Sequence, residues 1–464
     1  MIGIGLDFGT SNSTAAWFDG RQVHLVRLER DGPVLPTALH LDREFHALTG
    51  QDAIDRYIDE NRGRRVEMVA EVIGEAASGI TGSESGEDIT SRLQTQRNLV
   101  FGPLTDRGQP GRLFHGLKRL LGDPALERVP VFGRQFRLVA LITPILLRMR
   151  QAIEADAGHP ALPVMAGRPV HFEGSGQHND ALAQGRLAEA FGHAGLQGLA
   201  FREEPIGATL SYLHQARPQR PGLALTVDFG GGTLDLAVVH HDGDRFEVLG
   251  TAGLALGGDK IDQLIFARLL FPELGKGERW RRVVDGSVID TVFPFEEYET
   301  ALLHWPITHT LNQNRTKSML VDRMAQPDLA AEKFRRLHDL VCFNEGYTCF
   351  RAIRRAKVAL SSLEATDIDI PELNLRVPFT RARFDALLAG PLLQTRELVT
   401  GLLDRLQLPA TAIDTVIRTG GTSQIVAVRQ LLEDLFPGRV VAHDPFTSVA
   451  AGLAIASYRQ QRGG

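Results

Sequence analysis

Two short stretches decide the fold of this 464-residue chain: residues 225–235 (LTVDFGGGTLD) and residues 4–12 (IGLDFGTSN). In each, apolar residues run into Asp-Phe-Gly, small or hydroxyl-bearing residues follow, and apolar residues resume. This order is typical of a strand, a tight turn and a second strand. Asp7 and Asp228 lie nearly half a chain apart. We therefore expect two duplicated α/β halves facing a shared cleft.

The chain is too long for one compact core, so several domains are expected. After each hairpin, helical and strand-like segments alternate, and each half is interrupted by a long insertion. The segment from 271 to 362 is charged and is predicted to be helical. We expect a first core at residues 1–39 and 136–216, interrupted by a first insertion at residues 40–135. We expect a second core at residues 222–256 and 379–460, interrupted by a second insertion at residues 257–378.

Composition excludes several classes of function. The formal net charge is −5, and no cluster of lysine and arginine favours nucleic-acid binding. Cys342 and Cys349 do not have the spacing of a usual zinc site. The N-terminus does not resemble a signal peptide, and the most apolar segment, 138–147, is too short to span a bilayer. We expect a monomeric cytoplasmic protein that binds neither nucleic acid nor membranes.

The two Asp-Phe-Gly corners combine groups that bind phosphate with groups that repel it. Glycines let backbone N–H groups converge on an anion, and Thr10, Ser11 and Thr233 add hydroxyl donors. Asp7 and Asp228 would repel a phosphate, so their presence implies a cation. Hydrated Mg²⁺ suits two carboxylates, because it keeps several waters and takes few protein ligands. The alternative is that each aspartate caps its own turn; the duplication favours the metal and phosphate interpretation.

Two familiar phosphate-binding patterns do not fit. The glycines lie in a hairpin rather than at the start of a helix, and the G-x-x-x-x-G-K-[ST] pattern is not found. Asp-Phe-Gly occurs in protein kinases, but the other kinase motifs are missing.

Further segments, taken in order, make the chain resemble the actin-like ATPases and, among them, the seventy-kilodalton heat-shock chaperones. The resemblance covers the nucleotide-binding core of that family from Ile2 to about Ser457. The segments that carry it are 5–13 (GLDFGTSNS), 113–122 (LFHGLKRLLG), 167–172 (GRPVHF), 202–213 (REEPIGATLSYL), 227–239 (VDFGGGTLDLAVV), 354–362 (RRAKVALSS), 379–388 (FTRARFDALL) and 418–436 (RTGGTSQIVAVRQLLEDLF).

This resemblance implies a role for each matching residue. Asp7 and Asp228 would hold Mg²⁺ through water, Lys118 would stabilise charge at the γ-phosphate, and Glu204 and Asp235 would order the attacking water and the metal shell. Thr233 belongs to this catalytic set and also to the phosphate contacts. The phosphates would meet Gly9, Thr10, Ser11, Asn12, Gly230, Gly231, Gly232 and Thr233. The adenosine would meet Lys357, Ser361, Gly420, Gly421, Thr422 and Ser423.

The chain departs from that family at several positions. Arg354 stands where the family has a glutamate near the ribose, and Val358 stands where it has an arginine on the adenine. The family's switch proline corresponds to Pro169. Gln177 stands eight residues later, where the family has an arginine used in relaying the nucleotide state. The sequence stops at Gly464, so we expect no peptide-clamping domain, as in truncated, chaperone-like bacterial members.

The expected architecture is therefore α/β and actin-like: a duplicated ribonuclease H-like motif in two lobes, each with an inserted subdomain, around a nucleotide cleft. The favoured function is a Mg²⁺-dependent ATPase that binds ATP and ADP. Two alternatives remain, a small-molecule kinase of the same superfold and a non-catalytic actin-like regulatory or polymer-forming protein. Protein partners are expected to contact the insertions, at residues 40–135 or 271–350.

Overall fold

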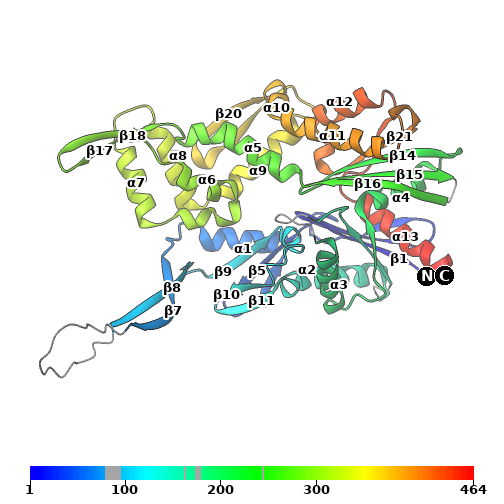
Figure 1. The fold of residues 1–464 in the computed structure, drawn as a ribbon, viewed down its shortest axis with the longest axis horizontal. Helices are drawn as coiled ribbons and strands as arrows, with labels where there is room; N and C mark the ends of the chain where they lie inside the picture. Colours follow the sequence, from blue (N-terminus) through cyan, green and yellow to red (C-terminus); the bar gives the residue numbers. More distant parts are fainter. Residues whose placement is uncertain (79–95, 161–162, 173–178, 243–244, 464) are drawn as a thin grey trace, which may run out of the picture.

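The structure is a computed structural model that describes residues 1–78, 96–160, 163–172, 179–242 and 245–463 (Figure 1). Its first sheet has the strand order β13-β12-β1-β2-β3, with β4 paired to β2. β1 pairs antiparallel with β2 and parallel with β12, which continues in parallel to β13. The strands are β1 Gly3–Phe8, β2 Asn12–Phe18, β3 Val23–Leu25, β4 Leu35–Pro36, β12 Val164–Arg168 and β13 Ala200–Glu203.

The second sheet repeats this plan. Its order is β16-β15-β14-β21-β22, with a central hairpin and two parallel strands on one side. Asp7 lies opposite Thr14 in the first hairpin, and Asp228 lies opposite Asp235 in the second. The two duplicated α/β halves predicted from the two corners are thereby confirmed. The strands are β14 Gly222–Phe229, β15 Leu234–Asp242, β16 Arg245–Leu254, β21 Thr415–Thr419 and β22 Val440–Ala442.

Strand alternation sends each aspartate to a definite face. Successive side chains of a strand point to opposite faces, and Ile4, Leu6 and Phe8 of β1 are fully buried in one core. The opposite face carries Gly3, Gly5 and then Asp7. In β14 the apolar positions 225, 227 and 229 likewise enter a core, which leaves Asp228 on the other face.

Those other faces are covered by two helices that meet between the sheets. α13 (Ser448–Gly463) contacts β1, β2 and β12, whereas α4 (Glu204–Ala216) contacts β14 and β15. The helices touch at Gly207 and Gly452, where a Cβ on Gly452 would lie 1.7 Å from the carbonyl oxygen of Gly207. Only glycine permits so close an approach of two backbones. This contact fixes the spacing of the two sheets.

The first insertion is built mainly from strands. β5 and its neighbours β6 and β9 form a small sheet, and β7 pairs with β8 in an arm that projects from the body (Figure 1). The elements are β5 Ala38–Asp42, β6 Ala47–Thr49, α1 Gln51–Asn61, β7 Met68–Ser78, β8 Gln96–Asp106, β9 Gly111–His115, η1 Leu117–Leu120, β10 Arg128–Val131 and β11 Arg134–Arg137. The helices α2 Leu138–Ala157 and α3 Asp180–His193 follow.

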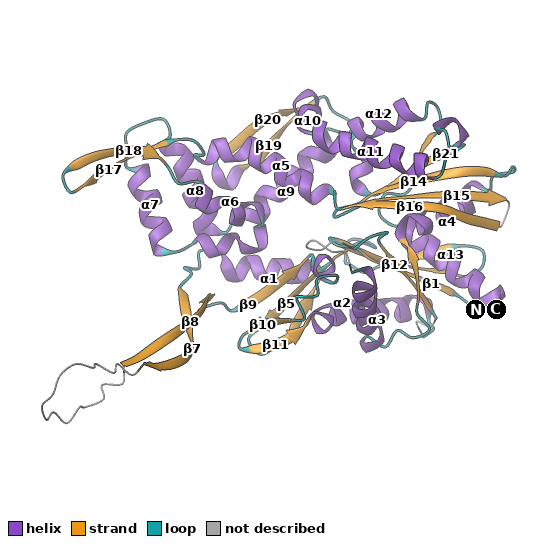
Figure 2. Cartoon of the chain, viewed as in Figure 1, coloured by secondary structure: helices purple, strands orange, loops and turns teal. Residues whose placement is uncertain are grey.

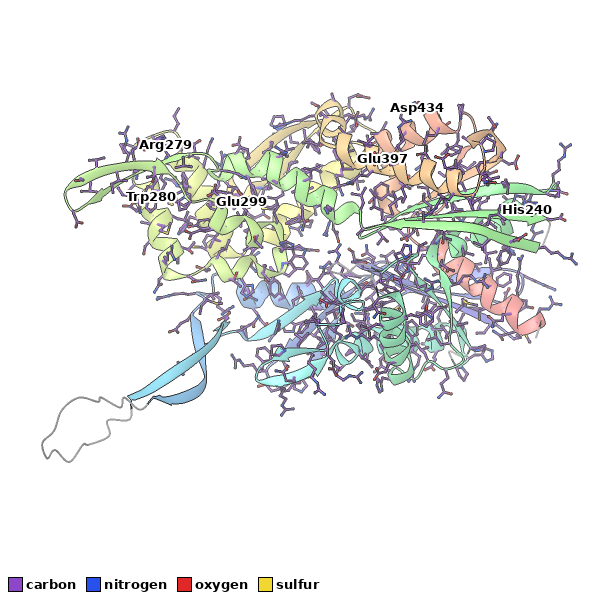
Figure 3. The ribbon with its side chains drawn as sticks, in the orientation of Figure 1. His240, Arg279, Trp280, Glu299, Glu397 and Asp434 are labelled. Atoms are coloured by element: carbon purple, nitrogen blue, oxygen red, sulfur yellow. The ribbon has the colours of Figure 1, made fainter. Side chains whose placement is uncertain are left out.

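The second insertion is mostly helical (Figure 2), but the prediction of helix throughout 271–362 was wrong. Residues 279–292 form a hairpin, β17–β18, whose Trp280 indole donates a hydrogen bond to Asp322 on α7 at 2.8 Å (Figure 3). The elements are α5 Gly258–Ile265, η2 Phe266–Leu270, η3 Phe271–Leu274, β17 Arg279–Val284, β18 Ser287–Val292, α6 Glu296–Leu303, η4 Trp305–Leu311, α7 Asn314–Met324, α8 Ala331–Phe343, α9 Gly346–Ala359, β19 Ala365–Ile370, η5 Pro371–Leu373 and β20 Leu375–Thr380.

The remaining helices complete the second half. They are α10 Arg381–Leu387, α11 Ala389–Arg405, η6 Ala410–Ala412, η7 Gly421–Gln424 and α12 Val426–Leu435. The two ends of the chain lie together (Figure 1), where the Gln461 side chain donates to the carbonyl of Ile2 at 3.0 Å. In the described parts of the chain, no helix has both the length and the apolar character needed to cross a membrane.

The contact between α4 and α13 predicts a sharp response to a single methyl group. Gly452→Ala forces the two backbones apart, and overpacking of this kind costs about 1–3 kcal/mol. We expect the midpoint of thermal unfolding to fall by several degrees. Gly401→Ala is the matched control, because this exposed helical glycine has no atom within 4 Å of an added Cβ; it should leave the midpoint unchanged or raise it. Equal midpoints for both variants would contradict this account of the helix contact.

Candidate functional site

A cavity of about 650 Å³ lies where β1 and β14 end. It brings together nearly all residues that the sequence assigned to a site. Those that line it are Asp7, Gly9, Thr10, Ser11, Asn12, Lys118, Glu204, Asp228, Gly230, Gly231, Gly232, Thr233, Lys357, Ser361, Gly420, Gly421 and Thr422.

Asp235 and Ser423 are the exceptions: both are buried, and neither lines the cavity. The Asp235 carboxylate accepts a hydrogen bond at 2.9 Å from the amide of Val170, just after Pro169. The Ser423 hydroxyl donates to the carbonyl of Gly420 at 2.8 Å. Both side chains therefore support the lining segments from behind. Gln177, the expected relay position, lies outside the described residues.

The acidic end of the cavity carries unbalanced charge. Burial, followed by the nearby Glu204 carboxylate, raises the pKa of Asp7 to about 7 and that of Asp235 to about 7. The same causes, in the same order, hold the pKa of Asp228 well above its usual range. Burial disfavours the ionised form of a carboxyl group, and neighbouring carboxylates add to the effect. Ionisation of all these carboxyl groups is therefore unfavourable unless a cation lies close to them.

Lys118 meets this charge directly. Its ammonium donates to Glu204 at 2.5 Å, and both side chains are buried. Burial alone would lower the pKa of Lys118, but the carboxylates of Glu204 and Asp7 outweigh it and raise that pKa. Glu204 begins α4 with Pro205 next to it, a position where the helix dipole favours a carboxylate. Lys118 therefore stays charged in the cavity.

The donor set fits a hydrated Mg²⁺. Oδ1 of Asp7 is buried, and among the described residues no group donates a hydrogen bond to it. A buried carboxylate oxygen is normally paired, so this unpaired oxygen, on a residue that lines the cavity, needs an explanation. Waters bound to Mg²⁺ would donate hydrogen bonds to this oxygen, and the charge of the ion would lower the pKa values of the neighbouring carboxyl groups.

The glycine turn after β14 is held in place by two other segments. The amides of Gly258 and Asp259 donate to the carbonyls of Gly230 and Gly231 at 3.0 and 2.9 Å. The Thr422 hydroxyl donates to the carbonyl of Gly230 at 2.8 Å. Three hydrogen bonds thus hold the turn after β14 in place, and such preorganisation lowers the entropy cost of binding a ligand.

Sequence reasoning missed an ionic network along one wall. The Asp259 carboxylate accepts from the Ser11 hydroxyl at 2.8 Å and from Arg119 at 2.9 Å, which links the two halves across the cavity. Asp262 pairs with Arg354 at 3.2 Å and also with Lys357. The sequence signal for this network is the segment 257–262, Gly-Gly-Asp-Lys-Ile-Asp, which is a third stretch that combines glycines with aspartates.

Comparison with known proteins identifies the family. The sequence profile described as Hsp70 protein matches residues 118–278 and 348–458, more than half of the chain.

The chain belongs to the Hsp70 family.

Individual Hsp70 relatives align along almost the whole chain. "Chaperone protein dnaK1" of Synechocystis sp. is 23% identical over 463 residues, 97% of this chain and 53% of its own length. "Heat shock 70 kDa protein, mitochondrial" of Solanum tuberosum is 23% identical, with 97% and 54% covered. "Heat shock 70 kDa protein BIP3" of Oryza sativa subsp. japonica is 25% identical, with 97% and 56% covered. The chain spans about half the length of these curated relatives.

The charge at this Hsp70 site predicts a stabilising substitution. A carboxyl group whose pKa rises on folding costs stability at every pH above its unfolded pKa. In a chelating buffer at neutral pH, Asp228→Asn should therefore raise the midpoint of thermal unfolding by about 2 °C or more.

Asp242→Asn, at the exposed end of β15, is the control and should leave the midpoint unchanged. A lower midpoint for Asp228→Asn than for the unmodified chain would contradict the assignment of surplus negative charge.

Proposed function

We propose that the chain binds ATP with Mg²⁺ between its two halves and hydrolyses it to ADP and phosphate. One observation carries this: both Asp-Phe-Gly turns and the Lys118–Glu204 pair converge on a single cavity. Membership of the Hsp70 family supports the same function, because the fold is that of the actin-like ATPases. The name of the Synechocystis relative, a chaperone protein about twice as long as this chain, supports a chaperone-like role for the ATPase.

Asp7 and Asp228 would hold Mg²⁺ through water, and the ion would neutralise charge on the phosphate oxygens. The turns 9–12 and 230–233 would present N–H and hydroxyl donors to the β- and γ-phosphates. Lys118 would stabilise the charge that develops on the γ-phosphoryl group as its bond to the leaving oxygen breaks. Glu204 fixes the Lys118 ammonium and would orient the attacking water beside it.

The part of the cavity around the Gly420–Thr422 turn, called the nucleoside end below, would take the nucleoside. Ser361 and Lys357 also line the cavity. The φ angle of Gly420 is +81°, and a Cβ there would lie 2.3 Å from the carbonyl oxygen of Phe229. Glycine therefore lets this turn lie directly against the second Asp-Phe-Gly corner.

A phosphate-release assay on the full chain with ATP and Mg²⁺ tests the proposal. Hydrolysis that stops when Mg²⁺ is chelated supports it. ATP that stays intact with the chain alone, but is consumed when a small-molecule hydroxyl acceptor is added, would favour a kinase instead.

Lys118→Ala tests the proposed role of the buried ammonium. We expect hydrolysis to fall by roughly 10²-fold or more, because a preorganised charge acts mainly in the transition state. Affinity for Mg-ATP, measured by calorimetry, should change far less. Lys260→Ala, an exposed lysine on α5 that does not line the cavity, serves as the matched control.

Unchanged hydrolysis in Lys118→Ala would remove this residue from the site. Thermal unfolding of the variant is measured in parallel, because removal of one partner of a buried ion pair can destabilise the fold.

A further inference from the structure

The nucleoside end of the cavity has an unusual lining for a site rich in charge. Phe446 and Val358 both line the cavity, yet their side chains are 52% and 72% exposed. Ile425 adds a third apolar side chain to the same end. Large apolar groups that remain accessible within a concavity mark a ligand surface more often than a packing defect.

The backbone of Phe446 is fixed by its neighbours. Asp444 accepts hydrogen bonds from the amides of Phe446 and Thr447, at 2.9 and 2.6 Å. The carbonyl of Phe446 lies 3.5 Å from the Thr14 hydroxyl of the first sheet. A Cβ on Gly421 would lie 3.2 Å from the Phe446 ring. The ring therefore stands against the backbone of the glycine turn.

This apolar end is continuous with the phosphate end. Thr422, which follows Gly421, donates to the carbonyl of Gly230 in the second phosphate turn. A nucleotide held by that turn would project its base past residues 420–422 toward Phe446. Gln424 also lines this end, and its side-chain amide can pair with the polar edge of a purine.

We propose that Phe446 stacks on the nucleobase. The inference rests on the proposed function, because the occupant is the base of the bound nucleotide. Val358 also lines the cavity, at the position where the resemblance implies an arginine on the adenine. The base would then be held by apolar contact rather than by a cation.

The test compares ATP with inorganic tripolyphosphate, which has the phosphates but no base. Loss of one stacked aromatic ring weakens binding by about fivefold to a hundredfold or more. Phe446→Ala should therefore weaken Mg-ATP binding in this range, measured by calorimetry, and leave Mg-tripolyphosphate binding unchanged. Phe446→Tyr should retain ATP affinity. Leu329→Ala, at a highly exposed leucine that does not line the cavity, should affect neither ligand.

Three results would overturn the proposal, and they differ in what they leave standing. Unchanged ATP affinity in Phe446→Ala removes the stacking role but keeps the ATP site. Equal losses for ATP and tripolyphosphate in Phe446→Ala show a general disturbance of the site rather than a base contact. Failure of the unmodified chain to bind ATP refutes the stacking proposal together with the proposed function.

Discussion

The backbone contact between Gly207 of α4 and Gly452 of α13 is the constraint on which the rest of the structure depends. Each helix covers one face of a sheet, and those faces end at Asp7 and Asp228. A methyl group at the contact would separate the helices and, with them, the two sheets. Because the helices touch, the two acidic glycine turns line one cavity. Each of the two duplicated halves contributes one turn, and the packing of α4 against α13 brings the two turns to one site.

Ionised carboxylates are costly at this site. Burial and mutual repulsion raise the pKa values of Asp7, Asp228 and Asp235, while Lys118 balances only part of the charge. Proteins commonly keep such strain where function requires it. A dication with its polyphosphate would relieve the repulsion and satisfy the unpaired oxygen of Asp7. The unfavourable electrostatics of the cavity thus support the proposed Mg-nucleotide.

The local sequence predicts the fold well where the residues of the candidate site also determine the backbone conformation. The Asp-Phe-Gly hairpins carry their own strand alternation and turn residues, so the two sheets could be predicted from them. The directions of the side chains could not be predicted, because they depend on tertiary packing. The Asp235 carboxylate accepts from the amide of Val170, and the Ser423 hydroxyl donates to the carbonyl of Gly420. The β17–β18 hairpin was not predicted because β18 is almost wholly exposed, and because β17 is held by hydrogen bonds to distant residues, Asp322, Arg323 and Gln326. The Ser11–Asp259 link joins residues far apart in the chain, which no local pattern reveals.

Titration of the unmodified chain with ATP, by calorimetry in Mg²⁺ and again in chelator, tests the central claim most directly. If both Asp-Phe-Gly turns bind one metal-bound nucleotide, a single ATP should bind per chain, and Mg²⁺ should increase the affinity for ATP. Equal affinity in the two buffers would show that the aspartates do not hold a metal. Two ATP molecules per chain would show that the turns act separately, and either result would contradict the account.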